Sequence, residues 1–205
     1  MAWLRACCYD LALSNTEARC LSAWRAELLK DARGVILDVG AGTGLNLRHV
    51  PKTDTRLILT EPDVDMRARL TRRAAQERPD AEVLDAPAEA LPLPDASVDV
   101  VVCTLVLCSV PKQAPALAEL RRVLRPGGRL VFLEHVAAED GSALLRWQRR
   151  IEPLWWHIAE RCALTRHTDQ ALLDAGFTLE TLRREPMRGG VPWVSPTIRG
   201  VARPR

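Results

Sequence analysis

A glycine-rich segment that follows an acidic residue is the part of this sequence best suited to bind a small molecule. Residues 38–44 read DVGAGTG, so Asp38 precedes Gly40, Gly42 and Gly44. Glycines at a strand end let the backbone turn tightly and approach a ligand closely. The spacing G-x-G-x-G differs from the G-x-G-x-x-G fingerprint that receives a pyrophosphate, and the preceding carboxylate would repel a phosphate. The segment therefore favours a ligand with a cationic amino-acid group.

A second acidic residue, Glu61, ends the next apolar run, 23 positions after Asp38. A carboxylate at that strand end can hold a ribose diol through two hydrogen bonds. The alternative interpretation is an ordinary glycine turn with a glutamate that caps the following helix. A strand before the glycines and an acid after the next strand together favour a nucleoside cofactor site.

Two patterns of apolar residues alternate along the chain and predict the strands and helices that must position these residues. Apolar runs predict strands at residues 35–39, 57–60, 81–84, 98–104 and 129–136, and helical spacing predicts helices at 16–30, 63–77 and 112–124. The last of these helices ends at the proline and glycines of residues 125–128. Strands that alternate with helices predict a Rossmann-like, doubly wound α/β sheet with right-handed crossovers.

The chain after residue 140 forms a different kind of segment. Apolar residues at helical spacing surround Pro153, which should kink a helix or begin a new one. Thr168 can cap a further helix, and residues 177–183 and 197–202 predict strands that give a mostly parallel sheet an antiparallel C-terminal strand. We expect a single domain over 1–205, made of an N-terminal helical segment (1–33), a cofactor-binding core (34–136) and a helical substrate cap with the final strands (137–205).

The charge of the chain limits its partners. The 29 basic and 26 acidic residues leave a net charge of +3, which argues against a nucleic-acid binder that neutralises phosphates in bulk. Residues 141–205 hold 11 basic and 6 acidic residues, together with four of the six tryptophans. The cap would therefore suit an anionic or thiolate acceptor, or peripheral contact with a negative membrane surface. A solvated basic face is the simpler alternative.

Hydropathy and cysteine usage indicate the compartment. No apolar run approaches the ~20 residues of a membrane span, and the start of the chain lacks a signal-peptide pattern, so we expect a cytoplasmic protein without a transmembrane segment. The six cysteines form no C-x-x-C pair, and Cys103 and Cys108 lie in an apolar run typical of buried thiols. The four histidines form no pair at metal-ligand spacing, so spacing predicts no metal site.

These motifs resemble those of the class I S-adenosylmethionine-dependent methyltransferases over nearly the whole chain. The resemblance rests on residues 38–44, Glu61 and the turn at 124–128, and it implies S-adenosylmethionine as cofactor and S-adenosylhomocysteine as product. Residues 88–99 are similar to the quinone-methyltransferase-like subgroup, which implies adenine contacts at the start of this segment. The cofactor-binding residues implied are Asp38, Gly40, Gly42, Gly44, Glu61, Pro62, Ala88, Glu89, Thr104 and Leu105.

A closer resemblance is carried by residues 99–110, which read DVVVCTLVLCSV, and by residues 134–136, 147–148, 152–153 and 162–166. These segments look like the small alkyl-thiol S-methyltransferases of the methyltransferase-like family. The resemblance implies methyl transfer to the sulfur of a small exogenous thiol by in-line displacement.

A thiol acceptor reacts as its thiolate, so the site needs one basic or positive group. His135 is the first catalytic candidate, because it ends the fifth predicted strand and its ordinary pKa lets it take a proton near neutral pH. Arg166 is the second, since a guanidinium could stabilise a thiolate. The alternatives are a histidine bonded to the backbone and an arginine at the surface or a helix end. Glu134 would orient His135 or form an ordinary ion pair.

Four further residues are predicted to line the substrate pocket: Tyr9, Cys108, Trp147 and Trp155. Cys108 follows the fourth predicted strand and is interpreted as pocket lining, because reactive cysteines need an electropositive, partly exposed site. Asp10 either closes over the cofactor together with Tyr9 or caps the first helix.

Several other functions stay open as alternatives. O- or C-methylation of a quinone, phenol or related aromatic metabolite would suit residues 88–99 and the tryptophans. The glycine spacing and Asp38 count against an NAD-dependent oxidoreductase. A nucleic-acid methyltransferase lacks support, because the sequence contains no DPPY-like motif and no basic arm interleaved with aromatics. A cofactor-binding module without catalysis is the remaining alternative.

Overall fold

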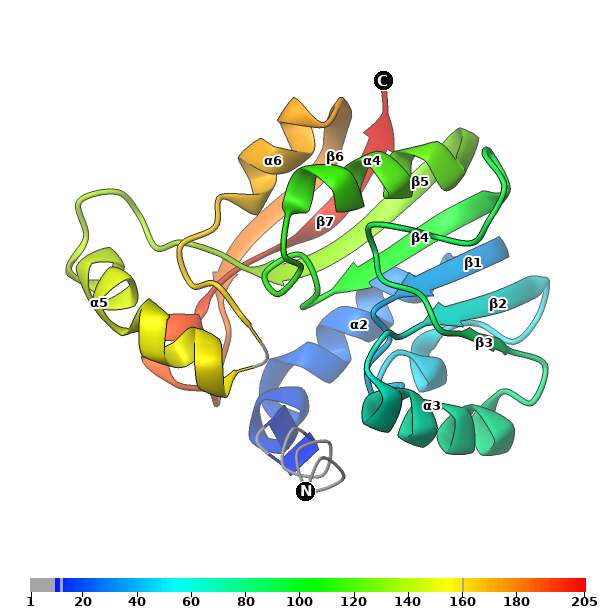
Figure 1. The fold of residues 1–205 in the computed structure, drawn as a ribbon, viewed down its shortest axis with the longest axis horizontal. Helices are drawn as coiled ribbons and strands as arrows, with labels where there is room; N and C mark the ends of the chain where they lie inside the picture. Colours follow the sequence, from blue (N-terminus) through cyan, green and yellow to red (C-terminus); the bar gives the residue numbers. More distant parts are fainter. Residues whose placement is uncertain (1–9, 12, 160) are drawn as a thin grey trace.

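The computed structural model of this chain describes residues 10–11, 13–159 and 161–205, and a seven-stranded sheet forms its centre (Figure 1). The strands lie in the order β3-β2-β1-β4-β5-β7-β6. Pairing is parallel from β3 to β5, and β7 is antiparallel to both of its neighbours. The strand bounds are β1 Gly34–Val39, β2 Thr55–Thr60, β3 Glu82–Leu84, β4 Val98–Thr104, β5 Leu124–His135, β6 Phe177–Pro186 and β7 Pro196–Pro204. The predicted Rossmann-like sheet with an antiparallel C-terminal strand is confirmed.

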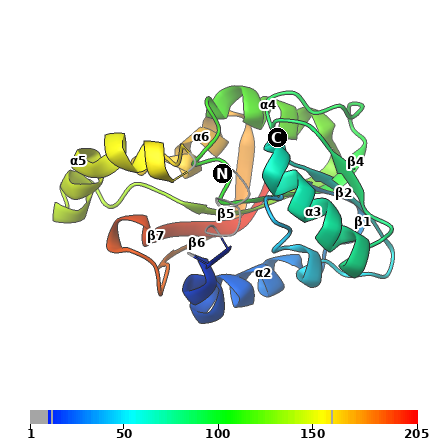
Figure 2. The same ribbon diagram turned by 60° about the horizontal axis from the view of Figure 1, so that its bottom comes forward.

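Helices cover both faces of this sheet, which explains why its central strands are apolar on both sides. The helix bounds are α2 Ser22–Leu29, α3 Val64–Glu77, α4 Gln113–Val123, α5 Ala143–Ile158 and α6 Thr168–Asp174. Helices α2 and α3 pack on one face around Ile36 and Leu59, and α4 and α6 pack on the other around Leu37 and Phe132. Figure 2 shows α2 and α4 on opposite sides of the sheet, with α5 projecting beyond its end. Within the described ranges, none of the helices combines the length and apolar character that crossing a bilayer requires.

The N-terminal helical segment follows the predicted amphipathic pattern. A π-helical turn at Glu17–Leu21 leads into α2, and the predicted inward residues Leu21 and Trp24 are buried. They form a small cluster with Leu133 of β5 and Met187. The first helical segment is thereby anchored against the strand that ends in the predicted catalytic histidine.

Three elements differ from their predicted form. β5 begins at Leu124 rather than at 129, because residues 125–128 form an irregularity across which the pairing with β4 continues. Pro153 lies inside α5, which continues through it as one helix and does not restart there. Thr168 is the first residue of α6 rather than its N-cap, and its hydroxyl accepts a hydrogen bond from Gln113 Nε2 at 3.0 Å. The Thr168 prediction was wrong because its side chain bonds to a neighbouring helix.

Gly200 of β7 lies where β6 and β7 pack closely against each other, and a substitution there can test this packing. The pairing of β6 with β7 shifts between Leu179 and Thr181, and a Cβ at Gly200 would lie 2.0 Å from the Thr181 carbonyl oxygen. We therefore expect Gly200→Ala to lower the free energy of unfolding by about 1–3 kcal/mol, as overpacking does, in urea denaturation. The control Gly190→Ala, whose Cβ would meet the Thr16 hydroxyl at 3.4 Å, should change little. Equal stability of both variants would contradict this close backbone approach.

Candidate functional site

The carboxyl ends of β1, β4 and β5 meet at one edge of the sheet, where open α/β proteins bind their ligands. There Asp38 is 1% exposed and accepts a hydrogen bond from the Asn46 side-chain amide at 3.0 Å. Arg25 of α2 donates to Asn46 Oδ1 and to Thr104 Oγ1, each at 2.7 Å. This network ties the N-terminal helix to the glycine segment and to the end of β4. Sequence reasoning missed Arg25 and Asn46, since neither belongs to a motif with a fixed spacing.

Asp38 lacks full charge compensation in this network. Burial raises the pKa of Asp38 to about 7, although the Asn46 hydrogen bond and the charge of Arg25 act in the opposite direction. The neighbouring Glu61 carboxylate adds to the increase. A buried carboxylate in this state is suited to a cationic ligand group, which would supply the missing positive charge.

The glycine segment is fixed by Glu61 at the end of β2. Glu61 is 7% exposed and accepts hydrogen bonds from the N–H groups of Gly42, at 2.8 Å, and Asp63, at 2.9 Å. Gly40 has a φ of +58°, and a Cβ there would lie 2.8 Å from a methyl group of Val106. A Cβ at Gly42 would meet no atom within 4 Å. The segment thus packs tightly against the loop after β4 and leaves space beside Gly42.

Asp10 lies against the glycine segment from the N-terminal side. Its carboxylate accepts a hydrogen bond from Thr43 Oγ1 at 2.6 Å and pairs with Arg69 of α3 at 3.1 Å. These contacts favour the interpretation in which Asp10 covers the site over the one in which it only caps a helix. Tyr9, the predicted substrate residue beside it, lies outside the described residues.

The other predicted cofactor residues differ in their surroundings. Pro62 is exposed and Ala88 is buried. Glu89 Oε1 is buried and has no hydrogen-bond partner among the described residues, so a ligand donor would relieve a costly unpaired oxygen. Leu105 has a left-handed φ of 60°, and its N–H donates to the Leu133 carbonyl at 2.7 Å. Its strained backbone redirects the chain immediately after β4.

A buried carboxylate holds the loop after β4. Glu134, which is 0% exposed, accepts hydrogen bonds from the backbone N–H groups of Val106 at 3.0 Å, Leu107 at 3.1 Å and Cys108 at 3.2 Å. Burial raises the pKa of Glu134, and the three hydrogen bonds act against that increase. The prediction that Glu134 orients His135 or forms an ordinary ion pair was wrong, because its carboxylate accepts these hydrogen bonds and positions the loop after β4.

This loop brings Cys108 beside two residues from other parts of the chain. His135 ends β5, and Cys162 lies between α5 and α6. One side-chain nitrogen of the histidine and the two sulfurs lie within 4.8 Å of one another, and His135 Nε2 is 2.6 Å from Cys162 Sγ. All three side chains are buried, and His135 Nδ1 has no hydrogen-bond partner among the described residues. Sequence reasoning quoted Cys162 within a motif but did not assign it to the site.

Members of this cluster change one another's protonation. The hydrogen bond to Cys162 and burial raise the pKa of Cys108 well above its usual range. The same hydrogen bond lowers the pKa of Cys162, while burial opposes that change. Burial disfavours a charged His135, but Cys108 and Glu134 raise the pKa of His135 overall. The arrangement therefore places hydrogen-bond donors around the Cys162 sulfur.

Arg166 holds the same loop from a second side. Its guanidinium donates to the carbonyl oxygens of Leu107 and Val110. Next to it, the Ala163 N–H donates to the Cys108 carbonyl at 2.9 Å. These contacts occupy both terminal guanidinium nitrogens and give Arg166 a positioning role. Its predicted direct contact with a thiolate stays a prediction.

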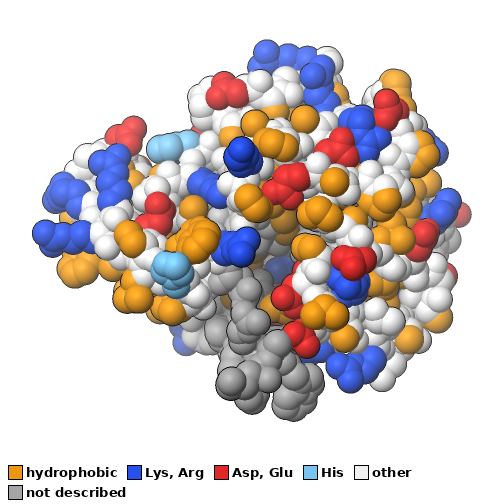
Figure 3. All heavy atoms as spheres, in the orientation of Figure 1, with side chains coloured by type: hydrophobic (Ala, Val, Ile, Leu, Met, Phe, Trp, Pro, Cys, Tyr) orange, Lys and Arg blue, Asp and Glu red, His pale blue; other side chains and the backbone are white. Residues whose placement is uncertain are grey.

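The two predicted pocket tryptophans lie in different environments. Trp155 is half-buried, packs edge-to-face on Trp193 with a centroid distance of 5.7 Å, and contributes through its indole to the lowered pKa of Cys162. Trp147 is 59% exposed on α5, where Figure 3 shows hydrophobic and basic side chains together at the surface. The fold thus brings Cys108, His135, Trp155 and Arg166 together, and it does not bring Trp147 to them.

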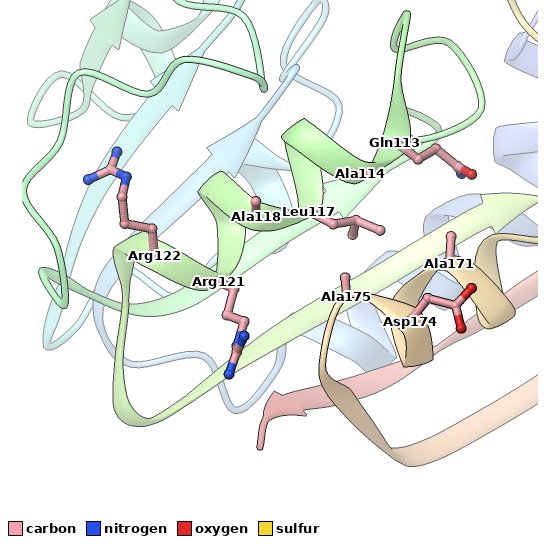
Figure 4. A pocket seen from close by; sticks show the side chains of 9 residues that line it. All are labelled: Gln113, Ala114, Leu117, Ala118, Arg121, Arg122, Ala171, Asp174 and Ala175. Atoms are coloured by element: carbon pink, nitrogen blue, oxygen red, sulfur yellow. The ribbon is translucent and has the colours of Figure 1, made fainter.

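A separate hollow lies between α4 and α6 and shares no residue with this site (Figure 4). Its charged side chains already have protein partners. Arg122 pairs with Glu119 and Asp95, and Asp174 accepts a hydrogen bond from Gln170. We therefore place the candidate site at the strand ends and not in this hollow.

The chain is similar to known proteins in both sequence and fold. The pattern of a methyltransferase domain family matches residues 37–132. Thiol S-methyltransferase TMT1B of Homo sapiens is 39% identical over 185 residues, which cover 85% of this chain and 75% of the relative. Thiol S-methyltransferase TMT1A of Homo sapiens is 38% identical over 172 residues, with 82% and 69% covered.

Solved structures share the fold at low sequence identity. A SAM-dependent methyltransferase from Aquifex aeolicus superposes with a TM-score of 0.61 at 17% identity, covering 87% of this chain and 88% of that one. Geranyl diphosphate C-methyltransferase from Streptomyces coelicolor A3(2), in complex with Mg²⁺, geranyl diphosphate and S-adenosyl-L-homocysteine, gives a TM-score of 0.69 at 15% identity, with 90% and 81% covered.

Glu134→Gln tests whether the buried carboxylate organises the site. A glutamine keeps the shape but directs an N–H₂ group at a backbone N–H, so one of the three loop hydrogen bonds is replaced by a donor–donor contact. We expect a lower Tm and faster hydrogen exchange of the amides of residues 106–108. Glu139→Gln, at an exposed position five residues later, is the matched control and should change neither. Unchanged hydrogen exchange at residues 106–108 in Glu134→Gln would show that the loop keeps its conformation without the carboxylate.

Proposed function

Because the chain belongs to the class I S-adenosylmethionine-dependent methyltransferases, and among them to the family of the thiol S-methyltransferases, we propose that it transfers the methyl group to the sulfur of a small exogenous thiol. The class and the methyl donor follow from the family, and the acceptor is the proposed part. One observation supports the thiol acceptor. The side chains of His135, Cys108 and Cys162 lie close together and are buried, at the edge of the sheet where Asp38 also lies.

The residues at the sheet edge fit S-adenosylmethionine, which supplies a methyl group on a positively charged sulfonium. Asp38, with its pKa raised to about 7 by burial, would bind the ammonium group. Glu61 would hold the ribose hydroxyls while it keeps the glycine segment in place. Glu89, with a buried oxygen that lacks a partner among the described residues, would accept the adenine amino group. Each assignment pairs an acceptor of this chain with a donor of the cofactor.

A small thiol has an ordinary pKa near 8.5, so most of it is protonated and unreactive at neutral pH. Burial at the cluster would exclude water, and His135 would favour the thiolate at the moment of attack. Trp155 and Trp193 would supply apolar surface for the alkyl part of the acceptor. Arg166 and Glu134 act through the loop that they hold and are therefore positioning residues.

Parallel assays with a small alkyl thiol and a phenol test the acceptor. We expect methylation of the thiol, and we expect His135→Asn to reduce thiol turnover by about 100-fold or more, the range of a lost acid–base group. Cofactor affinity, measured by calorimetry, should stay near that of the parent. Turnover of the phenol without turnover of the thiol would overturn the proposed acceptor. Unchanged thiol turnover in the variant would remove His135 from the mechanism.

The raised pKa of Asp38 predicts how cofactor affinity depends on pH. Below pH 7 the free protein carries a protonated Asp38, and a bound ammonium group favours the charged form, so binding releases a proton. Affinity should therefore rise by up to about tenfold per pH unit as the pH increases toward 7, and then level off. Calorimetry in two buffers of different ionisation enthalpy measures the proton release.

Asp38→Asn should bind the cofactor weakly and without this pH dependence, because the carboxyl group whose raised pKa produces it has been removed. The control Asp31→Asn, at an exposed position, should retain the parent behaviour. An unchanged pH profile in Asp38→Asn would show that another group takes up the proton.

A further inference from the structure

We propose that Cys108, His135 and Cys162 form a binding site for one soft divalent cation, best matched by Zn²⁺, which holds the acceptor thiol as its fourth ligand. The inference rests on the proposed function, because it specifies how that site would take its thiol. No pair spacing in the sequence points to it. The three residues come from the loop after β4, the end of β5 and the segment between α5 and α6.

The donor set matches a catalytic zinc site. Two cysteine sulfurs and one histidine nitrogen, with a fourth position left for water or substrate, are a known zinc arrangement in enzymes, whereas structural sites use four protein ligands. Among the described residues, this cluster contains three ligands of the right type. Thiolate ligands disfavour Mg²⁺ and Ca²⁺, which prefer oxygen.

The spacing of the three atoms is close to what tetrahedral coordination requires. Bonds of about 2.3 Å to sulfur and about 2.0 Å to nitrogen place neighbouring ligand atoms roughly 3.5–3.8 Å apart. The three atoms lie within 4.8 Å of one another, with His135 Nε2 and Cys162 Sγ at 2.6 Å. A cation therefore needs side-chain shifts of about 1 Å, which small rotations about side-chain bonds can supply.

The backbone beneath the ligands is already fixed. Cys108 donates its N–H to Glu134, and its carbonyl accepts the Ala163 N–H at 2.9 Å, which joins the two cysteine-bearing loops. The Cys162 N–H donates to the Ala159 carbonyl at 2.9 Å. A metal site requires ligands held in advance by such supporting contacts, and both cysteines have them.

The polar side-chain atoms of the three proposed ligands have few partners outside the cluster among the described residues. Cys108 Sγ has one neighbouring hydroxyl, that of Ser109 at 3.6 Å, and His135 Nδ1 has no partner within the part of the chain that the structure describes. Their exposed fractions are 2% for Cys108, 3% for His135 and 9% for Cys162. A cation bound by the two sulfurs and one ring nitrogen would give each of these three buried atoms a ligand bond.

The chemical step on this site balances without an oxidant or a reductant. The acceptor thiol binds the cation as its thiolate and releases its proton to solvent, since coordination deprotonates a thiol. A lone pair of that sulfur forms the new carbon–sulfur bond to the methyl group. The electron pair of the breaking bond stays on the sulfur of S-adenosylhomocysteine, which becomes neutral. The thioether, a weak ligand, then leaves the cation.

Metal content and cobalt spectroscopy test the site independently of turnover. The full chain is purified without chelators and analysed for zinc by mass spectrometry, and a second sample is loaded with Co²⁺ in the absence of cofactor and acceptor. We expect about one zinc ion per chain and, with Co²⁺, sulfur-to-metal charge-transfer bands with the visible bands of a tetrahedral site. Addition of a small alkyl thiol should shift these bands.

Cys162→Ser and Cys108→Ser should each lose most of the charge-transfer intensity and most of the bound zinc. The matched control is Cys20→Ser, which changes another buried cysteine that lies in the N-terminal helical segment and contacts Thr16 and Arg188 instead. Circular dichroism confirms that each variant folds. A folded parent protein without zinc and without cobalt bands would overturn the site, as would a Cys108–Cys162 disulfide in place of the ion.

The two proposals fail in different ways. If zinc binds and its removal leaves thiol turnover unchanged, the fourth-ligand role is overturned while the thiol methyltransferase activity stands. If zinc binds and only a phenol is methylated, the proposed acceptor is overturned together with the fourth-ligand role. Loss of thiol turnover on zinc removal, with recovery on zinc addition, would support both.

Discussion

The buried carboxylate of Glu134 is the constraint on which both halves of the site depend. It gathers three consecutive backbone N–H groups of the loop after β4, directly behind the left-handed Leu105. Val106 on this loop packs against Gly40, and Cys108 faces His135 and Cys162. One short loop thus forms a wall of the glycine segment and a member of the sulfur cluster. A displacement of this loop would alter both at once.

The local pattern of apolar residues was sufficient to predict the central strands of the sheet. Apolar runs placed β1, β2 and β4 within two residues, since strands buried on both faces must be apolar throughout. The rule that ligands bind at the carboxyl ends of strands led to Asp38, Glu61 and His135, which the fold brings to the same edge of the sheet. These predictions depend only on chain-local periodicity and on the topology of parallel sheets.

The rest of the site depends on contacts that no local pattern contains. His135 and Cys162 are 27 positions apart, and the segment that carries Cys162 follows a helix that projects away from the sheet. Spacing rules for metal ligands apply to ligands on one turn or one helix, so they did not detect this cluster. Arg25 escaped notice for a similar reason: its partners Asn46 and Thr104 come from two later elements.

The helical period of the apolar residues on α5 does not tell which face of this helix is packed. Trp147, Leu154 and Ile158 are among the apolar residues at helical spacing on α5, and they are 59%, 68% and 67% exposed, while Gln148 is buried. The amide of Gln148 explains why the face that carries it is packed: it donates to the carbonyls of Val136 and Trp193 and accepts the Ala138 N–H. A polar residue with three buried backbone partners sets the orientation of this helix.

Charge couples the two halves of the proposed reaction. The ammonium group of the cofactor would compensate Asp38, which burial otherwise keeps partly protonated near neutral pH. The sulfonium brings a second positive charge to the same sheet edge, where low exposure strengthens its attraction for a thiolate. Methyl transfer removes the sulfonium charge and the thiolate charge together. The attraction that favours the reacting pair therefore disappears with the reaction, so a neutral thioether has no electrostatic reason to stay.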